Sequence, residues 1–196
     1  MFELPPMQNW DAMHPLIIHI PIGLLLFVPI IIMLGLVAKQ NKDTYYLIGF
    51  IILVAGSIGL LLAIASGEAA ANVADTSIGN SKAILEEHEE LAETTRNVYL
   101  ILTLLYAAFL FLPKVIGKVL SDKVKLLGNI AFAVIFCIGI IFVVNTAHYG
   151  GVLVHEFGIK SKIKSSNVSN PAQQSVPNPN NQTPQQPGNF EKKDKD

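Results

Sequence analysis

The chain has 196 residues, of which 51% are hydrophobic and only 15% are charged, and its formal net charge is −1. Soluble domains carry roughly 25% charged residues, so this composition excludes an ordinary soluble protein and indicates a membrane protein. No basic patch suggests nucleic-acid binding, and no nucleophile elbow or phosphate loop suggests a hydrolase. We find no basic n-region or cleavage motif of a signal peptide, so we expect the first span to act as its own anchor.

Four apolar stretches are candidates for membrane spans, because a span needs about 20 mostly apolar residues. They are Ile17–Val37, Tyr45–Ala65, Val98–Leu112 and Leu126–Val144. The sequence therefore predicts an all-α protein, an up-and-down bundle of four transmembrane helices. We place the membrane domain at residues 14–159, after an outer segment 1–13, with spans at about 15–38, 45–68, 91–112 and 125–148.

The loops predict an orientation through the positive-inside rule, which counts Lys and Arg in short loops. Six lysines lie in the loops after spans one and three: Lys39, Lys42, Lys114, Lys118, Lys123 and Lys125. The loop on the opposite side has only Lys82 and Arg96, whereas Lys160, Lys162 and Lys164 after span four argue mildly against the assignment. We expect both termini on the outer face of a bacterial inner (cytoplasmic) membrane. The Pro-, Asn- and Gln-rich residues 160–196 should form a disordered tail.

Span one begins with two histidines. His14 precedes Pro15, and because the residue before a proline favours extended geometry, His14 should lie at the entry of the helix. His19 is about one turn deeper, and we expect it to be buried, which would make it a functional residue. Pro21 and Pro29 should kink or loosen the helix.

Span two has small residues at every fourth position, at Ala55, Gly59, Ala63 and Gly67. This pattern favours close packing of a neighbouring helix, although the same strip could leave room for a flat macrocycle. Glu68 follows at the depth of the histidines, where it could ligate a metal, pair with a histidinium or lie among headgroups.

The third helix should begin at Ser81 as its N-cap and run to Leu112. A stripe with steps of three and four residues lies along it and includes His88: Ile84, His88, Leu91, Thr95, Val98 and Leu102. Five glutamates lie off this stripe: Glu86, Glu87, Glu89, Glu90 and Glu93. His88 should therefore face the other helices.

Span four should end near Gly150 and Gly151, about one turn beyond His148, and His155 follows. The single Cys137 reads as a small core residue. Alternating helix directions would bring all five histidines to one membrane face. A shared polar or metal-binding pocket at that face follows as a hypothesis.

Three segments resemble a bacterial membrane family catalogued as domain of unknown function 2231. His14–Leu24 (HPLIIHIPIGL) is similar to its opening H-P-x-x-x-H-F-P-I-A-L, and His88–Ala92 and His148–Val154 resemble its third-helix histidine and its Gly-Gly-x-Leu-Val ending. The resemblance covers residues 13–159 and departs at His155, where we expect tyrosine in relatives. Some relatives are fused to cytochrome c-like domains, which implies redox work. The four-helix layout also resembles di-haem cytochrome b proteins.

Histidines on facing helices can hold a b-type haem, and the absence of C-x-x-C-H excludes covalent attachment. We expect haem b ligands among His14, His19, His88 and His148. We would then expect the chain to be an electron-transfer subunit rather than a stand-alone enzyme. It would act near the periplasmic face with quinol, a periplasmic cytochrome or other membrane subunits as partners.

Two alternatives stay open. A non-haem site for zinc, copper or iron could use His19, His88, His148 and Glu68. The chain could instead be a structural membrane subunit without a cofactor, whose histidines bond only to one another and to headgroups.

Overall fold

The computed structural model describes residues 10–159, which form four long helices after a short 3-10 helix, Trp10–Met13. The long helices are α1 (His14–Val37), α2 (Lys42–Ala71), α3 (Ser81–Val115) and α4 (Asp122–His155). The described part of the chain contains no strand. This confirms the predicted all-α class.

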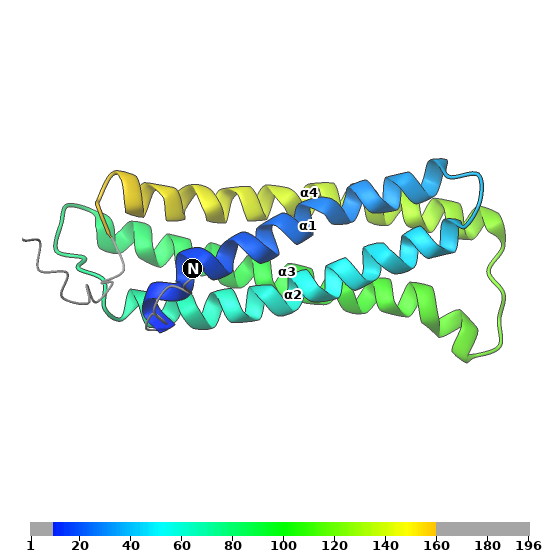
Figure 1. Cartoon of the computed structure of the whole chain (residues 1–196), viewed down its shortest axis with the longest axis horizontal. Helices are drawn as coiled ribbons and strands as arrows, with labels where there is room; N and C mark the ends of the chain where they lie inside the picture. Colours follow the sequence, from blue (N-terminus) through cyan, green and yellow to red (C-terminus); the bar gives the residue numbers. More distant parts are fainter. Residues whose placement is uncertain (1–9, 160–196) are drawn as a thin grey trace, which may run out of the picture. The chain divides into compact units, whose positions relative to one another are not determined.

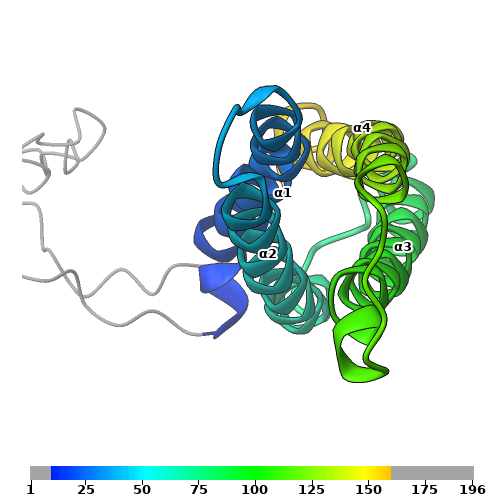
Figure 2. The ribbon, with the colours of Figure 1, turned by 90° about the vertical axis from the view of Figure 1, so that its right-hand side faces the viewer.

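Successive helices run in opposite directions along the bundle (Figure 1), and they form a ring when the bundle is viewed from its end (Figure 2). Each helix packs on its two neighbours in the order α1, α2, α3, α4, and α4 closes the ring on α1. The end view places α1 and α3 at opposite corners (Figure 2). The starts of α1 and α3 therefore share one end of the bundle with the ends of α2 and α4.

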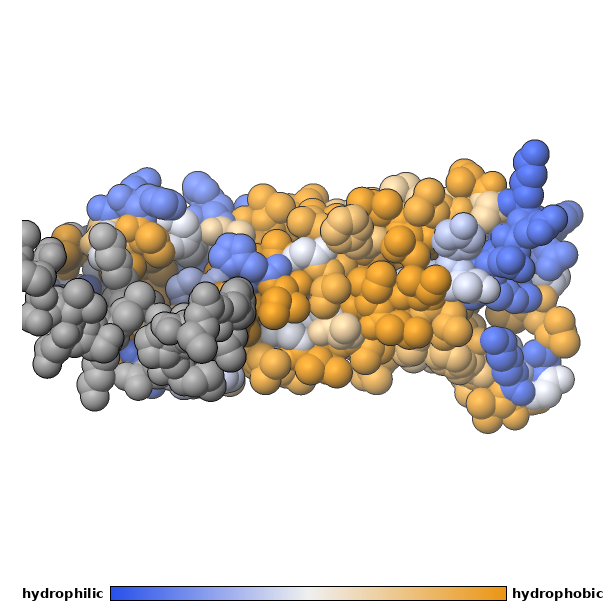
Figure 3. All heavy atoms as spheres, in the orientation of Figure 1, coloured by the Kyte–Doolittle hydropathy of each residue, from blue (hydrophilic) through white to orange (hydrophobic). Residues whose placement is uncertain are grey.

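All four helices are long and apolar enough to cross a membrane. On the face seen in Figure 3, apolar residues cover the middle of the bundle, and hydrophilic residues gather toward its ends. Large apolar side chains such as Leu16, Phe27 and Leu104 are exposed on its outside, as expected for contact with lipid. The helices contain 24 to 35 residues, or about 36–52 Å at 1.5 Å per residue. They are longer than the roughly 30 Å of hydrocarbon, so their polar ends extend beyond it.

Helix α1 packs closely on α2 because glycines of α2 face its side chains. A Cβ added to Gly59 would lie 3.0 Å from Pro21, and one added to Gly56 would lie 2.7 Å from Leu25. The predicted close packing of span two is therefore confirmed, although Ala55 is exposed and does not belong to the contact face. Since α1 covers this face, the strip leaves no room there for a macrocycle.

Four local expectations about the helices are wrong. Cys137 of α4 is exposed and is not a core residue. Helix α4 continues through Gly150 and Gly151 to His155, because one interior glycine costs only about 1 kcal/mol in helix propensity and the neighbouring helix packs on this part of α4. Asn80, not Ser81, is the N-cap of α3, and Ser81 is buried in its first turn. His14 is the first residue of α1 and not an extended residue before it.

We predict that Gly56→Ala destabilises the bundle. The new methyl group would lie 2.7 and 2.9 Å from Cδ2 and Cγ of the fully buried Leu25, and overpacking of this kind costs about 1–3 kcal/mol. Unfolding by SDS titration in detergent micelles measures the change in free energy. Gly23→Ala is the matched control in α1, because a Cβ there meets no atom within 4 Å. Equal stability of the two variants would contradict the packing described above.

Candidate cofactor-binding site

His14 lies in the interface between α1 and α2. Its Nδ1 is 3.0 Å from the hydroxyl of Ser66, which is fully buried and donates its own proton to the carbonyl of Ala63 at 3.0 Å. The imidazole ring fits against α2 because residue 67 is glycine. A Cβ at this position would lie 3.1 Å from Cε1 of His14. The imidazole is thus seated on the backbone of α2.

His88 occupies the corresponding interface between α3 and α4. Its Nδ1 is 3.0 Å from the backbone carbonyl oxygen of Thr146, and a Cβ added to Gly150 would lie 3.1 Å from its Cε1. Below the ring, the hydroxyls of Thr95 and Thr146 are 2.9 Å apart and join the same two helices. The predicted inward direction of His88 is confirmed.

These hydrogen bonds fix the tautomers of both rings. A carbonyl oxygen only accepts, so Nδ1 of His88 carries a proton. The Ser66 hydroxyl gives its proton to Ala63, so it accepts from Nδ1 of His14. When each ring is neutral, its Nε2 has a lone pair, and the hydrogen bonds of the two rings to Ser66 and Thr146 use Nδ1. A metal-ligating histidine commonly has this arrangement, with Nδ1–H bonded to the protein.

The two histidines belong to a pattern that occurs once in each helix hairpin. In the first hairpin, Leu25 lies eleven residues after His14 and packs on Gly56, which lies eleven residues before Gly67. The second hairpin has the same spacing: Tyr99 lies eleven residues after His88 and packs on Gly139, eleven residues before Gly150. Eighteen residues after each histidine the pattern continues, between Ile32 and Gly49 and between Tyr106 and Phe132. The hairpin α1–α2 is therefore repeated in its packing by α3–α4.

This repeat explains why His14 and His88 have equivalent surroundings. They lie on helices at opposite corners of the ring and at the same end of the bundle (Figures 1 and 2). The structure thus places two half-buried imidazoles, one on α1 and one on α3, at the same end of the bundle.

The other candidate ligands lie elsewhere. His19, His148 and Glu68 are exposed, as is His155. The expectation that His19 is buried is wrong, because its ring points away from the bundle core and its Nδ1 bonds to the Pro15 carbonyl of its own helix. Within the described residues, no group of three or more His, Cys, Asp or Glu side chains is placed to hold a metal ion. The four-residue set His19, His88, His148 and Glu68 is not assembled here.

The outer turn of α3 is acidic, as the stripe on this helix predicts. All five glutamates off the stripe are exposed, and Glu87 accepts a hydrogen bond of 2.8 Å from the hydroxyl of Tyr149 on α4. Glu68 of α2 and Glu89 of α3 are near enough to repel each other. Negative charge therefore surrounds the end of the bundle that contains the histidines.

Sequence reasoning missed the residues that hold the two rings, which are Ser66, Gly67, Thr146 and Gly150. The sequence does contain a signal for them. Ser66-Gly67 and Thr146 with Gly150 lie at the ends of spans two and four, at the depth of the histidines. A glycine there permits close approach of an aromatic ring.

We predict that Gly150→Ala weakens the hydrogen bond from Nδ1 of His88 to Thr146. The added Cβ, at 3.1 Å from Cε1, displaces a ring that this bond holds in place. In protein labelled with ¹⁵N-histidine, the Nδ1–H of His88 should exchange faster with solvent. Gly151→Ala is the control, since a Cβ there meets nothing within 4 Å. Unchanged exchange in Gly150→Ala would show that the glycine is not needed to seat the ring.

Comparison with protein families gives a match. The family model described as "Predicted membrane protein (DUF2231)" matches residues 11–162. A search of the curated proteins and of the solved structures finds no match. The matched region includes all four helices and both inward histidines. The chain therefore belongs to the DUF2231 family of predicted membrane proteins.

Proposed function

We propose that this membrane protein binds one b-type haem between His14 and His88 and transfers electrons near one membrane surface. The observation that carries the proposal is the equivalent pair of imidazoles, each with Nδ1 bonded to the protein and a lone pair on Nε2. Haem iron accepts neutral imidazole as an axial ligand. A bis-histidine haem needs one such nitrogen from each of two helices.

The number of ligands favours haem over a bare metal ion. The porphyrin supplies four nitrogens, so two histidines complete the coordination of its iron. Structural zinc sites need four protein ligands, and catalytic zinc sites need three. Among the described residues, no group of three or more His, Cys, Asp or Glu side chains is placed to hold a metal ion. Two histidine ligands are therefore enough for a haem iron, whose porphyrin supplies the other four nitrogens, but too few for a bare metal ion.

A buried hydroxyl near the histidines gives further support. Ser81 lies seven residues before His88 on α3, about 10 Å nearer the end of the helix. Its Oγ is buried and has no hydrogen-bond partner in the described part of the chain. Buried polar groups are normally paired, and a haem propionate directed toward the surface would supply an acceptor for this hydroxyl.

The position of the pair limits the electron transfer that it can support. His14 and His88 lie at one end of the bundle, and no second histidine pair lies at the other end within residues 10–159. By the positive-inside rule the histidine end faces the periplasm of a bacterial inner membrane, with both termini on that side. The proposed path runs between quinol in the membrane and a carrier at this surface, such as a periplasmic cytochrome.

We predict that the purified full chain, expressed with an adequate haem supply, shows a Soret band that is lost in His14→Ala and in His88→Ala. Each substitution removes one of the two axial nitrogens. His19→Ala and His148→Ala are matched controls, because both side chains are exposed, and they should retain the full band. Gel filtration and circular dichroism establish that each variant is folded.

Three results would contradict the haem proposal. Loss of the band in His19→Ala but not in His14→Ala would assign the ligands to other residues. A colourless protein with stoichiometric zinc, copper or iron would indicate a non-haem metal site. A colourless, metal-free and folded protein would indicate a structural subunit.

A further inference from the structure

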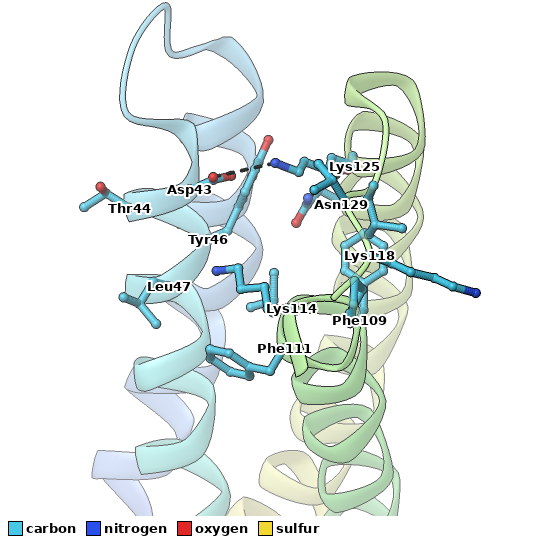
Figure 4. Close-up of a pocket in the computed structure, with 14 residues that line it drawn as sticks. Asp43, Thr44, Tyr46, Leu47, Phe109, Phe111, Lys114, Lys118, Lys125 and Asn129 are labelled. Atoms are coloured by element: carbon cyan, nitrogen blue, oxygen red, sulfur yellow. Dashed lines mark hydrogen bonds and ion pairs between the residues drawn. The ribbon is translucent and has the colours of Figure 1, made fainter. Parts of the chain in front are cut away.

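A cavity of about 440 Å³ lies at the end of the bundle opposite the histidines. It lies between the start of α2 and the end of α3, and the loop from α3 to α4 lines its outer side (Figure 4). The cavity is independent of the proposed haem site, because none of its lining residues belongs to the histidine end. Any function of this cavity can therefore be tested separately.

The polar side of the cavity has a positive charge. Lys114, Lys118 and Lys125 line it together with a single acidic residue, Asp43. Figure 4 shows the ammonium group of Lys118 pointing away from the cavity. Asp43 is 3.8 Å from the ammonium group of Lys125. Within residues 10–159, Lys114 and Lys118 form no ion pair, and Figure 4 shows Lys114 extended across the cavity toward α2. The cavity thus has positive charge that no described carboxylate neutralises.

The opposite side of the cavity is apolar. Leu47 of α2 and Phe109, Phe111 and Pro113 of α3 contribute to its lining. Leu47 and Phe111 are also exposed, and they belong to helices whose apolar surface ends at a hydrophilic end of the bundle (Figure 3). A ligand in this cavity would contact charged groups and apolar groups at the same time, at the depth of the lipid headgroups.

We propose that this cavity binds the headgroup of an anionic phospholipid. The phosphate would lie beside Lys114, with Lys125 as a further cation, and the start of the acyl chains would lie along Leu47 and Phe111. Basic pockets between membrane helices bind anionic headgroups through such lysines. A soluble phosphate would gain the charge contacts but not the apolar ones, so the shape of the lining favours a lipid.

The test is native mass spectrometry of the full chain, delipidated in neutral detergent and mixed with phosphatidylglycerol, phosphatidylcholine or inorganic phosphate. One phosphatidylglycerol should bind more tightly than phosphatidylcholine, and phosphate alone should not displace it. Lys114→Gln should weaken phosphatidylglycerol binding about fivefold. Asp43→Asn should strengthen it, because it removes the only acidic group in the lining; the ion pair lost is exposed and contributes little to stability.

Lys123→Gln is the matched control, since Lys123 lies at the same end of the bundle but does not line the cavity. It should leave binding unchanged. Equal binding of phosphatidylcholine, or an equal loss in Lys123→Gln and Lys114→Gln, would overturn the site. Displacement of the lipid by equimolar inorganic phosphate would assign the cavity to a soluble phosphorylated ligand instead.

Discussion

The close approach of paired helices at glycine residues is the constraint on which the rest of the structure depends. Where α1 meets α2 and α3 meets α4, a missing side chain lets an imidazole lie directly on the facing backbone, at Gly67 and at Gly150. Only at that separation can Nδ1 of His14 and of His88 reach an oxygen of the partner helix. The hydrogen bond then fixes the tautomer, and the tautomer leaves a lone pair on Nε2. The haem ligation proposed for His14 and His88 depends on these contacts.

The repeat of this packing in the two hairpins has a functional consequence. Two hairpins with the same internal contacts present their histidines at the same depth and from opposite corners of the ring, as a ligand held from both sides requires. The same symmetry keeps the pair at one end of the bundle. The opposite end has a different character, with lysines around a cavity. A haem at one surface and an anionic lipid at the other would give the two ends separate roles, one in electron transfer and one in contact with the membrane.

Much of the fold could be predicted from the sequence. Which face of each helix points into the bundle could be predicted for α3 but not for α1. The apolar runs were sufficient for four helices, and the polar residues around His88 marked which side of α3 faces inward. Helix α1 is apolar on all sides, so nothing in its sequence distinguishes the inward position of His14 from the outward position of His19. The helix through Gly150 depends on packing against α3, a tertiary effect that local preference does not include. The oxygens that hold the rings are common backbone and serine groups, which become recognisable only when the helices are assembled.

The central claim is that His14 and His88 are two equivalent ligands of one iron. Pulsed EPR of the oxidised protein, prepared with ¹⁵N-histidine, tests it most directly. A low-spin ferric haem with hyperfine coupling to two histidine nitrogens is the result that the pair predicts. A high-spin ferric signal, or coupling to only one histidine, would contradict it.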